Sequence, residues 1–135
     1  FTDQAAALRL LADLLLSDKQ YNEAIKTYNQ WLDFTGEKEA NVYLRIASAY
    51  MEMKQYQKVI EPADMAIALQ DKAKPNAGPY TLKFSAYFEM KNNKKAIEVL
   101  ETTVKIFPSE KRWWTYLAQF YSIEEQYDKA LVTLE

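Results

Sequence analysis

Apolar residues recur along this chain at helical spacing, and the whole pattern repeats. Within each copy the apolar positions are three and four residues apart, which places them on one face of an α-helix. The copies are anchored by Ala24, Val59, Ala96 and Ala130, at intervals of 35, 37 and 34 residues. A period of this length is typical of a solenoid, in which each helical pair buries its apolar face against its neighbours.

Each copy predicts a first helix, a tight turn and a second helix. The predicted first helices cover about residues 3–17, 39–54, 79–91 and 110–124, and the second helices about 22–35, 55–70, 94–107 and 127 onward. We expect Gly36 to end the second helix of the first copy in a left-handed conformation. Ser109 is the expected N-cap of the last first helix. Pro62 removes an amide donor and should bend the second helix of copy two.

The length and spacing predict one array rather than several domains. We expect repeats at about 5–38, 40–73 and 77–110, a truncated repeat at 111–135, and the longest connection at 71–78. Pro75 and Gly78 in that connection oppose helix continuation. The chain starts at Phe1 without an initiator Met, and its last predicted helix is short. We therefore expect flanking segments, and an upstream signal peptide or anchor stays open.

Small and large residues alternate at matching places in three of the first helices. The small residues are Ala12, Ala47 and Ala118, and the large residues before them are Leu11, Ile46 and Leu117. Helix axes approach to about 8–10 Å where small side chains leave room, so we expect both sets in the core. The third copy has Phe84 and Lys83 at these places, which predicts a local repacking.

Aromatic residues also recur in phase with the repeat. The tyrosines at 21, 56 and 127 and those at 50, 87 and 121 occupy matching places, and we expect core rings with hydroxyls that reach the surface. Trp114 falls on the same core face. Trp113 lies one position away from it, which leaves two interpretations open. Its ring is either stacked against the second helix of copy three or exposed as a contact residue.

The repeated frame resembles the tetratricopeptide repeat (TPR). The last copy contains Trp114-x-x-Leu117-Ala118-x-x-Tyr121 and then Tyr127-x-x-Ala130. The second copy contains Tyr43-x-x-Ile46-Ala47-x-x-Tyr50 and then Tyr56-x-x-Val59. The resemblance covers residues 5–135 and implies an all-α, right-handed α-solenoid of stacked antiparallel helix pairs, the TPR superhelix.

The resemblance also implies a concave groove lined by the first helices. Carried over position by position, the groove residues are Ala6, Arg9, Asp13 and Leu16; Asn41, Leu44, Ser48, Met51 and Glu52; Thr81, Ser85, Phe88 and Glu89; and Arg112, Thr115, Gln119 and Ser122. Apolar side chains among polar ones suit an extended or helical peptide. The alternative is that these residues only keep the surface soluble.

One known ligand mode of the TPR family does not fit this groove. Some members bind the C-terminal carboxylate of heat-shock chaperones through paired Lys and Asn residues. Arg9 fits the first basic position, but Asp13 stands where an Asn is needed. Leu44 and Thr81 offer no positive charge. We therefore do not expect a carboxylate clamp.

Copies two to four also resemble a bacterial TPR subfamily, which is encoded with TonB, ExbB and ExbD energy-transduction systems in Gram-negative bacteria. The similar segments are Tyr87-Phe88-Glu89-Met90-Lys91, Lys95-Ala96-x-x-Val99-Leu100-Glu101 and Phe107-Pro108-Ser109-x-Lys111-x-Trp113-Trp114. This resemblance implies a periplasmic location and a TonB-system component as the protein partner. The absence of cysteine fits an oxidising compartment, and the residues alone leave a cytoplasmic location open.

Composition argues against several functional classes. The net charge of −2 and pI near 5.3 give no basic stripe for nucleic acid. The chain has no His and no Cys, so the commonest catalytic bases, nucleophiles and zinc ligands are missing. The carboxylates of Asp13, Glu52 and Glu89 lie on successive first helices about 8–10 Å apart, too far to share a metal. We expect no cofactor, no metal and no membrane span in this chain.

These observations predict a non-catalytic protein–protein interaction scaffold that holds a partner peptide in its concave groove. The alternative is a structural, self-associating module that makes its contacts through the convex face or the terminal helices. Leu131 and Leu134 are the candidate contact residues for that alternative.

Overall fold

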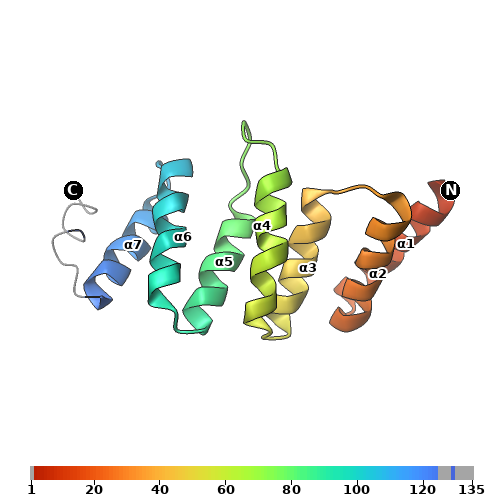
Figure 1. The fold of residues 1–135 in the computed structure, drawn as a ribbon, viewed down its shortest axis with the longest axis horizontal. Coiled ribbons are helices and arrows are strands. Elements are labelled where there is room, and N and C mark those ends of the chain that lie inside the picture. The colour runs from red at the N-terminus through yellow and green to blue at the C-terminus, as the bar shows by residue number, and fades with distance from the viewer. Residues whose placement is uncertain (1, 125–128, 130–135) are drawn as a thin grey trace.

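The fold is all-α in the part of the chain that the structure, a computed structural model, describes: residues 2–124 and 129 (Figure 1). These residues form seven α-helices and one 3₁₀ turn. Their bounds are α1 Thr2–Ser17, α2 Tyr21–Thr35, α3 Ala40–Glu52, η1 Tyr56–Val59, α4 Ile60–Leu69, α5 Gly78–Glu89, α6 Asn93–Ile106 and α7 Lys111–Ile123. The predicted helix from residue 127 onward, with Leu131 and Leu134, lies outside the described residues.

The helices pack as consecutive antiparallel pairs that follow one another along the molecule. The pairs are α1 with α2, α3 with η1 and α4, and α5 with α6, and α7 packs on α6. Each later pair also contacts the pair before it, through α2 with α3 and through α4 with α5. Figure 1 shows this order along the longest axis, from α1 at one end to α7 at the other. The molecule is therefore an all-α solenoid.

The core is divided among the pairs rather than collected at one centre. One apolar cluster joins α1, α2 and α3 around Tyr28 and Trp31. A second joins α3, η1, α4 and α5 around Ala47 and Ala63. A third joins α6 and α7 around Leu100. Since each cluster needs residues from more than one pair, no pair buries its apolar face alone.

A lysine in a left-handed conformation closes the turn within each complete pair. Lys19, Lys54 and Lys91 have φ values of 62°, 60° and 58°. Only Gly36 was expected in this conformation, and its φ of 67° at the end of α2 confirms that prediction. Non-glycine residues seldom adopt positive φ, so the amino-acid type gave no signal for the lysine turns.

Pro62 and Ser109 do not have the helix-bending and helix-capping roles that the sequence predicted. Pro62 does not bend a continuous helix, because a 3₁₀ turn precedes α4 and places Pro62 in the first turn of α4. An amide there has no partner within the helix, so proline is tolerated. Ser109 is not the N-cap of α7. Glu110 holds that position without a side-chain hydrogen bond.

The predicted alternation of sizes is confirmed for all the small residues and for two of the three large ones. Ala12, Ala47 and Ala118 are buried, as are Ile46 and Leu117. Leu11 was expected in the core, but 48% of its surface is exposed. The difference has a physical cause: Ile46 is covered by α2 and Leu117 by α6, whereas no described helix precedes α1.

The third pair is repacked at the predicted place. Lys83 leaves the core, and its Nζ lies 2.7 Å from Asp64 Oδ1 on α4. Phe84 is half-buried and packs against the cluster of α6 and α7. Trp113 is buried in this cluster, which decides between its two interpretations. Trp114 is only half-buried, and its Nε1 donates to the Pro108 carbonyl at 2.9 Å.

The lysine turns give a test of this fold. Lys54→Gly should raise the free energy of unfolding by about 0.5–1 kcal/mol, because glycine relieves left-handed strain while it adds some unfolded-state entropy. The melting temperature should rise by about 2–4 °C. Lys26→Gly, in the middle of α2, should instead lower stability by about 1 kcal/mol. Circular-dichroism melts compare the two, and equal signs would contradict the turn geometry.

Candidate peptide-binding surface

The predicted groove residues lie along the first helix of each pair, α1, α3, α5 and α7. We call the surface that these helices present the odd-helix face. The half-buried members are Arg9, Asp13, Leu16, Leu44, Ser48, Met51, Thr81 and Ser85. The exposed members are Ala6, Asn41, Glu52, Phe88, Glu89, Arg112, Thr115, Gln119 and Ser122. No predicted groove residue is buried, so each retains surface for a contact.

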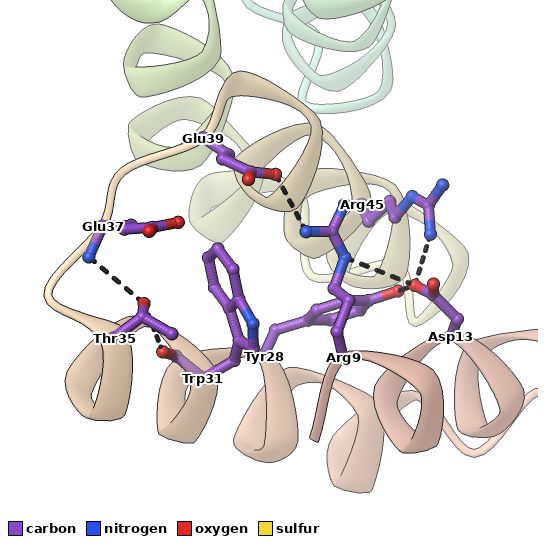
Figure 2. A network of polar contacts seen from close by, with 8 residues as sticks. All are labelled: Arg9, Asp13, Tyr28, Trp31, Thr35, Glu37, Glu39 and Arg45. Carbon is purple, nitrogen blue, oxygen red and sulfur yellow. Dashed lines mark hydrogen bonds and ion pairs between the residues drawn. The ribbon is translucent and has the colours of Figure 1, made fainter. Parts of the chain in front are cut away.

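At the N-terminal end of this face, Asp13 is the centre of a polar network (Figure 2). Its Oδ1 accepts a hydrogen bond from the buried Tyr28 hydroxyl at 2.5 Å and another from Arg45 Nη1 on α3. Arg9 Nη1 lies 2.8 Å from Glu39 Oε2, just before α3. The network therefore joins α1 and α2 to the start and middle of α3.

Arg9 is held from three sides. Besides the ion pair with Glu39, its Nε lies 3.9 Å from Asp13 Oδ1. Its guanidinium carbon also lies 5.2 Å from the centre of the Trp31 ring, within the range of a cation–π contact. Figure 2 shows Arg9 above Trp31 and Tyr28, between the two carboxylates. Because these partners already satisfy its charge, Arg9 is poorly placed to receive a peptide carboxylate.

The network changes the acid–base properties of its members. Burial raises the pKa of Asp13, but hydrogen bonds from Tyr28 and Arg45 and the charges of Arg45 and Arg9 outweigh it, and the net pKa is lowered. Burial and the hydrogen bond to Asp13 raise the pKa of Tyr28 to about 12. Hydrogen bonds to Tyr28 and Asp13 raise the pKa of Arg45. The ionised Asp13 therefore stabilises the fold.

At the other end of the odd-helix face, aromatic rings join α5 to α7. Phe84 stacks on Phe88 within α5 and on Tyr116 across to α7, with ring centres 6.2 Å and 5.7 Å apart. Phe120 of α7 meets Phe84 and Phe88 edge to face, at 5.4 Å and 5.9 Å. Contacts in this range stabilise by about 0.5–1.5 kcal/mol each beyond burial.

Two rings of this cluster keep large exposed surfaces. Phe88 is 53% exposed and Tyr116 is 39% exposed. Phe84 and Phe120 hold them from behind, so the exposed rings are fixed before a ligand arrives. Ser85 and Gln119 lie one turn or less along the same helices and offer hydrogen-bonding groups. We define Phe88 and Tyr116 as the aromatic patch. It can bind an apolar or aromatic side chain at low entropic cost.

Among the hollows that the described residues form away from this patch, two are the largest. One of about 480 Å³ is at the edge between the second and third pairs. Asn41 and Leu44 line it, together with Gln70, Lys74 and Pro79. A larger one of about 900 Å³ lies between α2, α3 and α4, where Tyr43, Ile46, Tyr50 and Met65 form much of its wall. Residues of α2, η1 and α4 complete the wall of the larger hollow.

Sequence reasoning missed four of the six residues of the polar network and two of the four rings of the aromatic cluster. Tyr28, Trp31, Glu39 and Arg45 were not predicted as partners of Arg9 and Asp13. Tyr116 and Phe120 were not predicted beside Phe88. A signal existed for the aromatic cluster, since Phe84 and Phe88, and likewise Tyr116 and Phe120, are four residues apart and share a helix face. The polar network gave none, since its partners are 15 to 32 residues apart.

Other kinds of site find little support among the described residues. No three His, Cys, Asp or Glu side chains of residues 2–124 and 129 gather where they could hold a metal ion. None of the helices α1 to α7 is both long and apolar enough to cross a bilayer.

Comparisons with known proteins agree on the fold. A model of the family described as ChAPs (Chs5p-Arf1p-binding proteins) matches residues 11–135. The crystal structure of MamA is similar at 24% identity and a TM-score of 0.77, over 96% of this chain and 73% of that chain. A TPR repeats protein from Bacteroides fragilis is 25% identical with a TM-score of 0.75, over 90% of this chain and 53% of that chain.

A third similar structure contains a peptide ligand. The first TPR of Spaghetti (RPAP3), bound to the HSP90 peptide SRMEEVD, is 18% identical with a TM-score of 0.71, over 93% of this chain and 96% of that chain. No curated protein matches this chain. The structural likenesses establish a TPR-like solenoid fold, and the peptide belongs to that other protein.

The polar network predicts a pH-dependent stability difference. Asp13→Asn should lower the free energy of unfolding by about 1 kcal/mol near pH 7, a modest value because a third of the side chain is exposed. The melting temperature should fall by about 4 °C. Because the folded-state pKa of Asp13 is lowered from 3.8, its contribution is present above that value and disappears as the pH falls through the lowered pKa.

Thermal melts at about pH 7 and about pH 2 test this expectation. The original chain and Asp13→Asn should differ at the higher pH and converge at the lower one. Asp33→Asn, which changes an exposed carboxylate on α2, is the control and should change the melting temperature little at either pH. An Asp13→Asn deficit that persists unchanged at low pH would contradict the role of the ionised carboxylate.

Proposed function

Because this chain belongs to the ChAPs family, the Chs5p-Arf1p-binding proteins, we propose that it is a non-catalytic scaffold that binds a segment of another protein on its odd-helix face. The aromatic patch of Phe88 and Tyr116 is the observation that carries the proposal. Phe88 and Tyr116 are the two most exposed large aromatic side chains among the residues described above, and Phe84 stacks on both of them. Aromatic residues with fixed rings are typical anchors of protein interfaces.

The odd-helix face has a polar network at its N-terminal end and the aromatic patch at its other end, and this difference indicates the chemistry of the ligand. Arg9 and Asp13 neutralise each other and their partners at the N-terminal end. That end therefore offers little to a strongly charged ligand. The patch at the other end offers apolar ring surface with hydroxyl and amide groups nearby. We infer that the ligand is a segment with at least one apolar or aromatic side chain, aligned by hydrogen bonds to Ser85 and Gln119.

The family description supplies the first candidate partners. ChAPs are described as binding Chs5p and Arf1p, and these two proteins are the partners that we propose to test first. The resemblance to TPR proteins of TonB, ExbB and ExbD systems supports a different partner and a periplasmic location. No comparison adds to that second prediction, so purified TonB serves as a third probe in the same binding measurement.

The proposal predicts that the patch contributes most of the binding energy. Phe88→Ala and Tyr116→Ala should each weaken binding by about 10- to 30-fold, because truncation of an anchor at an interface costs about 1.5–2 kcal/mol. Ser85→Trp should weaken it further by filling the adjacent surface. The measurement is isothermal titration with purified Arf1p, Chs5p and TonB, followed by a displayed library of random peptides if none of the three binds.

Leu10→Ala is the matched control, since Leu10 is 59% exposed but lies at the N-terminal end of the solenoid. It should bind like the original chain, and all variants should keep the helical circular-dichroism signal. If Phe88→Ala and Tyr116→Ala bind every selected ligand as well as the original chain does, the aromatic patch is not the binding surface.

A further inference from the structure

The hollow of about 900 Å³ is an open space between two second helices. Its walls come from α2 on one side and from η1 and α4 on the other, and α3 forms its floor. Both α2 and α4 pack on α3, but they contact each other little. Figure 1 shows α3 between them along the longest axis. We call this space the α2–α4 hollow.

The floor and one wall of the α2–α4 hollow are mostly apolar. Tyr43, Ile46 and Tyr50 follow one face of α3 at intervals of three and four residues. Met65 and Ala68 belong to the α4 wall. The two tyrosines are only half-buried, so their rings keep surface for a contact. Grooves with an apolar and aromatic floor commonly bind the apolar face of an amphipathic helix.

The next repeat contains a matching but smaller hollow. It lies between α4 and α6 and has a volume of about 340 Å³. Its floor is formed by α5, where Tyr80 and Tyr87 stand at the places of Tyr43 and Tyr50. Because the two hollows are built on the same frame, the residues that differ between them indicate what keeps the larger one open.

An ion pair joins the floor and the wall of the smaller hollow. Lys83 of α5 and Asp64 of α4 both line it, and Lys83 Nζ lies 2.7 Å from Asp64 Oδ1. The residues at the same places of the repeat in the α2–α4 hollow are Ile46 and Asn29. These two side chains cannot form an ion pair. The α2–α4 hollow therefore lacks this bridge.

Three charged side chains line the α2–α4 hollow: Lys58, Glu61 and Asp64. Asp64 is already paired with Lys83. Lys58 lies over the Tyr50 ring, with its Nζ 5.9 Å from the ring centre. Glu61 is exposed and forms no ion pair with another of the described residues. The α4 wall thus presents an unpaired negative charge one turn away from a positive charge.

The smaller hollow has the same two charges in a different state. Lys95 and Glu98 stand at the places of Lys58 and Glu61, and they pair with each other at 3.4 Å. Together with the pair of Lys83 and Asp64, this satisfies every charge that lines the smaller hollow. Glu61, by contrast, remains available to a ligand.

We propose that the α2–α4 hollow binds an amphipathic α-helix of a partner protein. Large apolar side chains of that helix, at positions i, i+3 or i+4, and i+7, pack on Tyr43 and Tyr50. A basic residue of the helix pairs with Glu61, and an acidic residue one turn away pairs with Lys58. The α4 wall from Lys58 to Ala68 is about 15 Å long, which matches about three turns of a helix.

This proposal goes beyond the function proposed above and does not depend on it. The α2–α4 hollow shares no residue with the aromatic patch. Phe88→Ala should therefore leave binding to the hollow unchanged, although it weakens binding to the odd-helix face. The two proposals can succeed or fail independently.

A displayed library of helical segments, each about four turns long, tests the proposal with the whole chain as the target. Selected positions of each segment vary among Leu, Ala, Lys and Glu. We expect enriched segments to have Leu at positions i, i+3 or i+4, and i+7, with a Lys and a Glu one turn apart beside the leucines. Enrichment of no helical segment would overturn the proposal.

Two tryptophan variants locate the binding site of a synthetic enriched segment by fluorescence anisotropy. Ala68→Trp should weaken binding by at least about tenfold, because the indole fills the hollow from an exposed position near the end of α4. Lys105→Trp is the matched control, since Lys105 is exposed at the same place on α6. It should bind the segment like the original chain, and circular dichroism confirms that both variants fold.

A charge exchange tests the complementarity. The double variant Lys58→Glu, Glu61→Lys should bind the enriched segment about 2- to 5-fold more weakly, because exposed ion pairs contribute little each. It should prefer a segment in which Lys and Glu have exchanged places. Unchanged preference would contradict the assigned ion pairs.

Two further outcomes would overturn the proposal. If Ala68→Trp binds the segment as well as Lys105→Trp does, the segment binds elsewhere. If the chain without any segment has a mass above 15.8 kDa in light scattering, and Ala68→Trp restores the monomer, the occupant of the hollow is a second copy of this chain.

Discussion

The structure depends on the inability of a single helical pair to bury its own apolar face. Three of the four first helices present a small residue at the matching position, and these residues, Ala12, Ala47 and Ala118, are all buried. These small residues let the neighbouring helix approach closely. The core consequently runs as a series of clusters along the array, and every cluster draws on more than one pair.

Stacking fixes the spacing of the first helices, and the side chains between them give each junction its own chemistry. Arg9, Asp13 and Arg45 make the junction of α1 and α3 ionic. Met51 and Leu82 belong to the aliphatic cluster that joins α3 and α5. Aromatic rings connect α5 and α7. One architecture thus places a self-satisfied polar region and an exposed aromatic region on the same face, which is why we assign recognition to the latter.

The same constraint explains the two exposed apolar regions. The aromatic patch lies at the junction of α5 and α7, where Phe84, in place of a small residue, stacks on both Phe88 and Tyr116. Leu10, Leu11 and Leu14 of α1 are exposed because no described helix packs on that side of α1. The first region is a built surface, with rings held from behind.

The sequence by itself determined the solenoid, since helical spacing, repeat length and the alternation of small and large residues are local or periodic patterns. It also located the repacking at Lys83 and Phe84. Only the tertiary structure decided which residues meet. Tyr28 and Arg45 reach Asp13 from positions 15 and 32 residues away. Leu11 is exposed while Ile46 and Leu117 are buried, because burial depends on whether a neighbouring pair is present, and residue type alone does not contain that information.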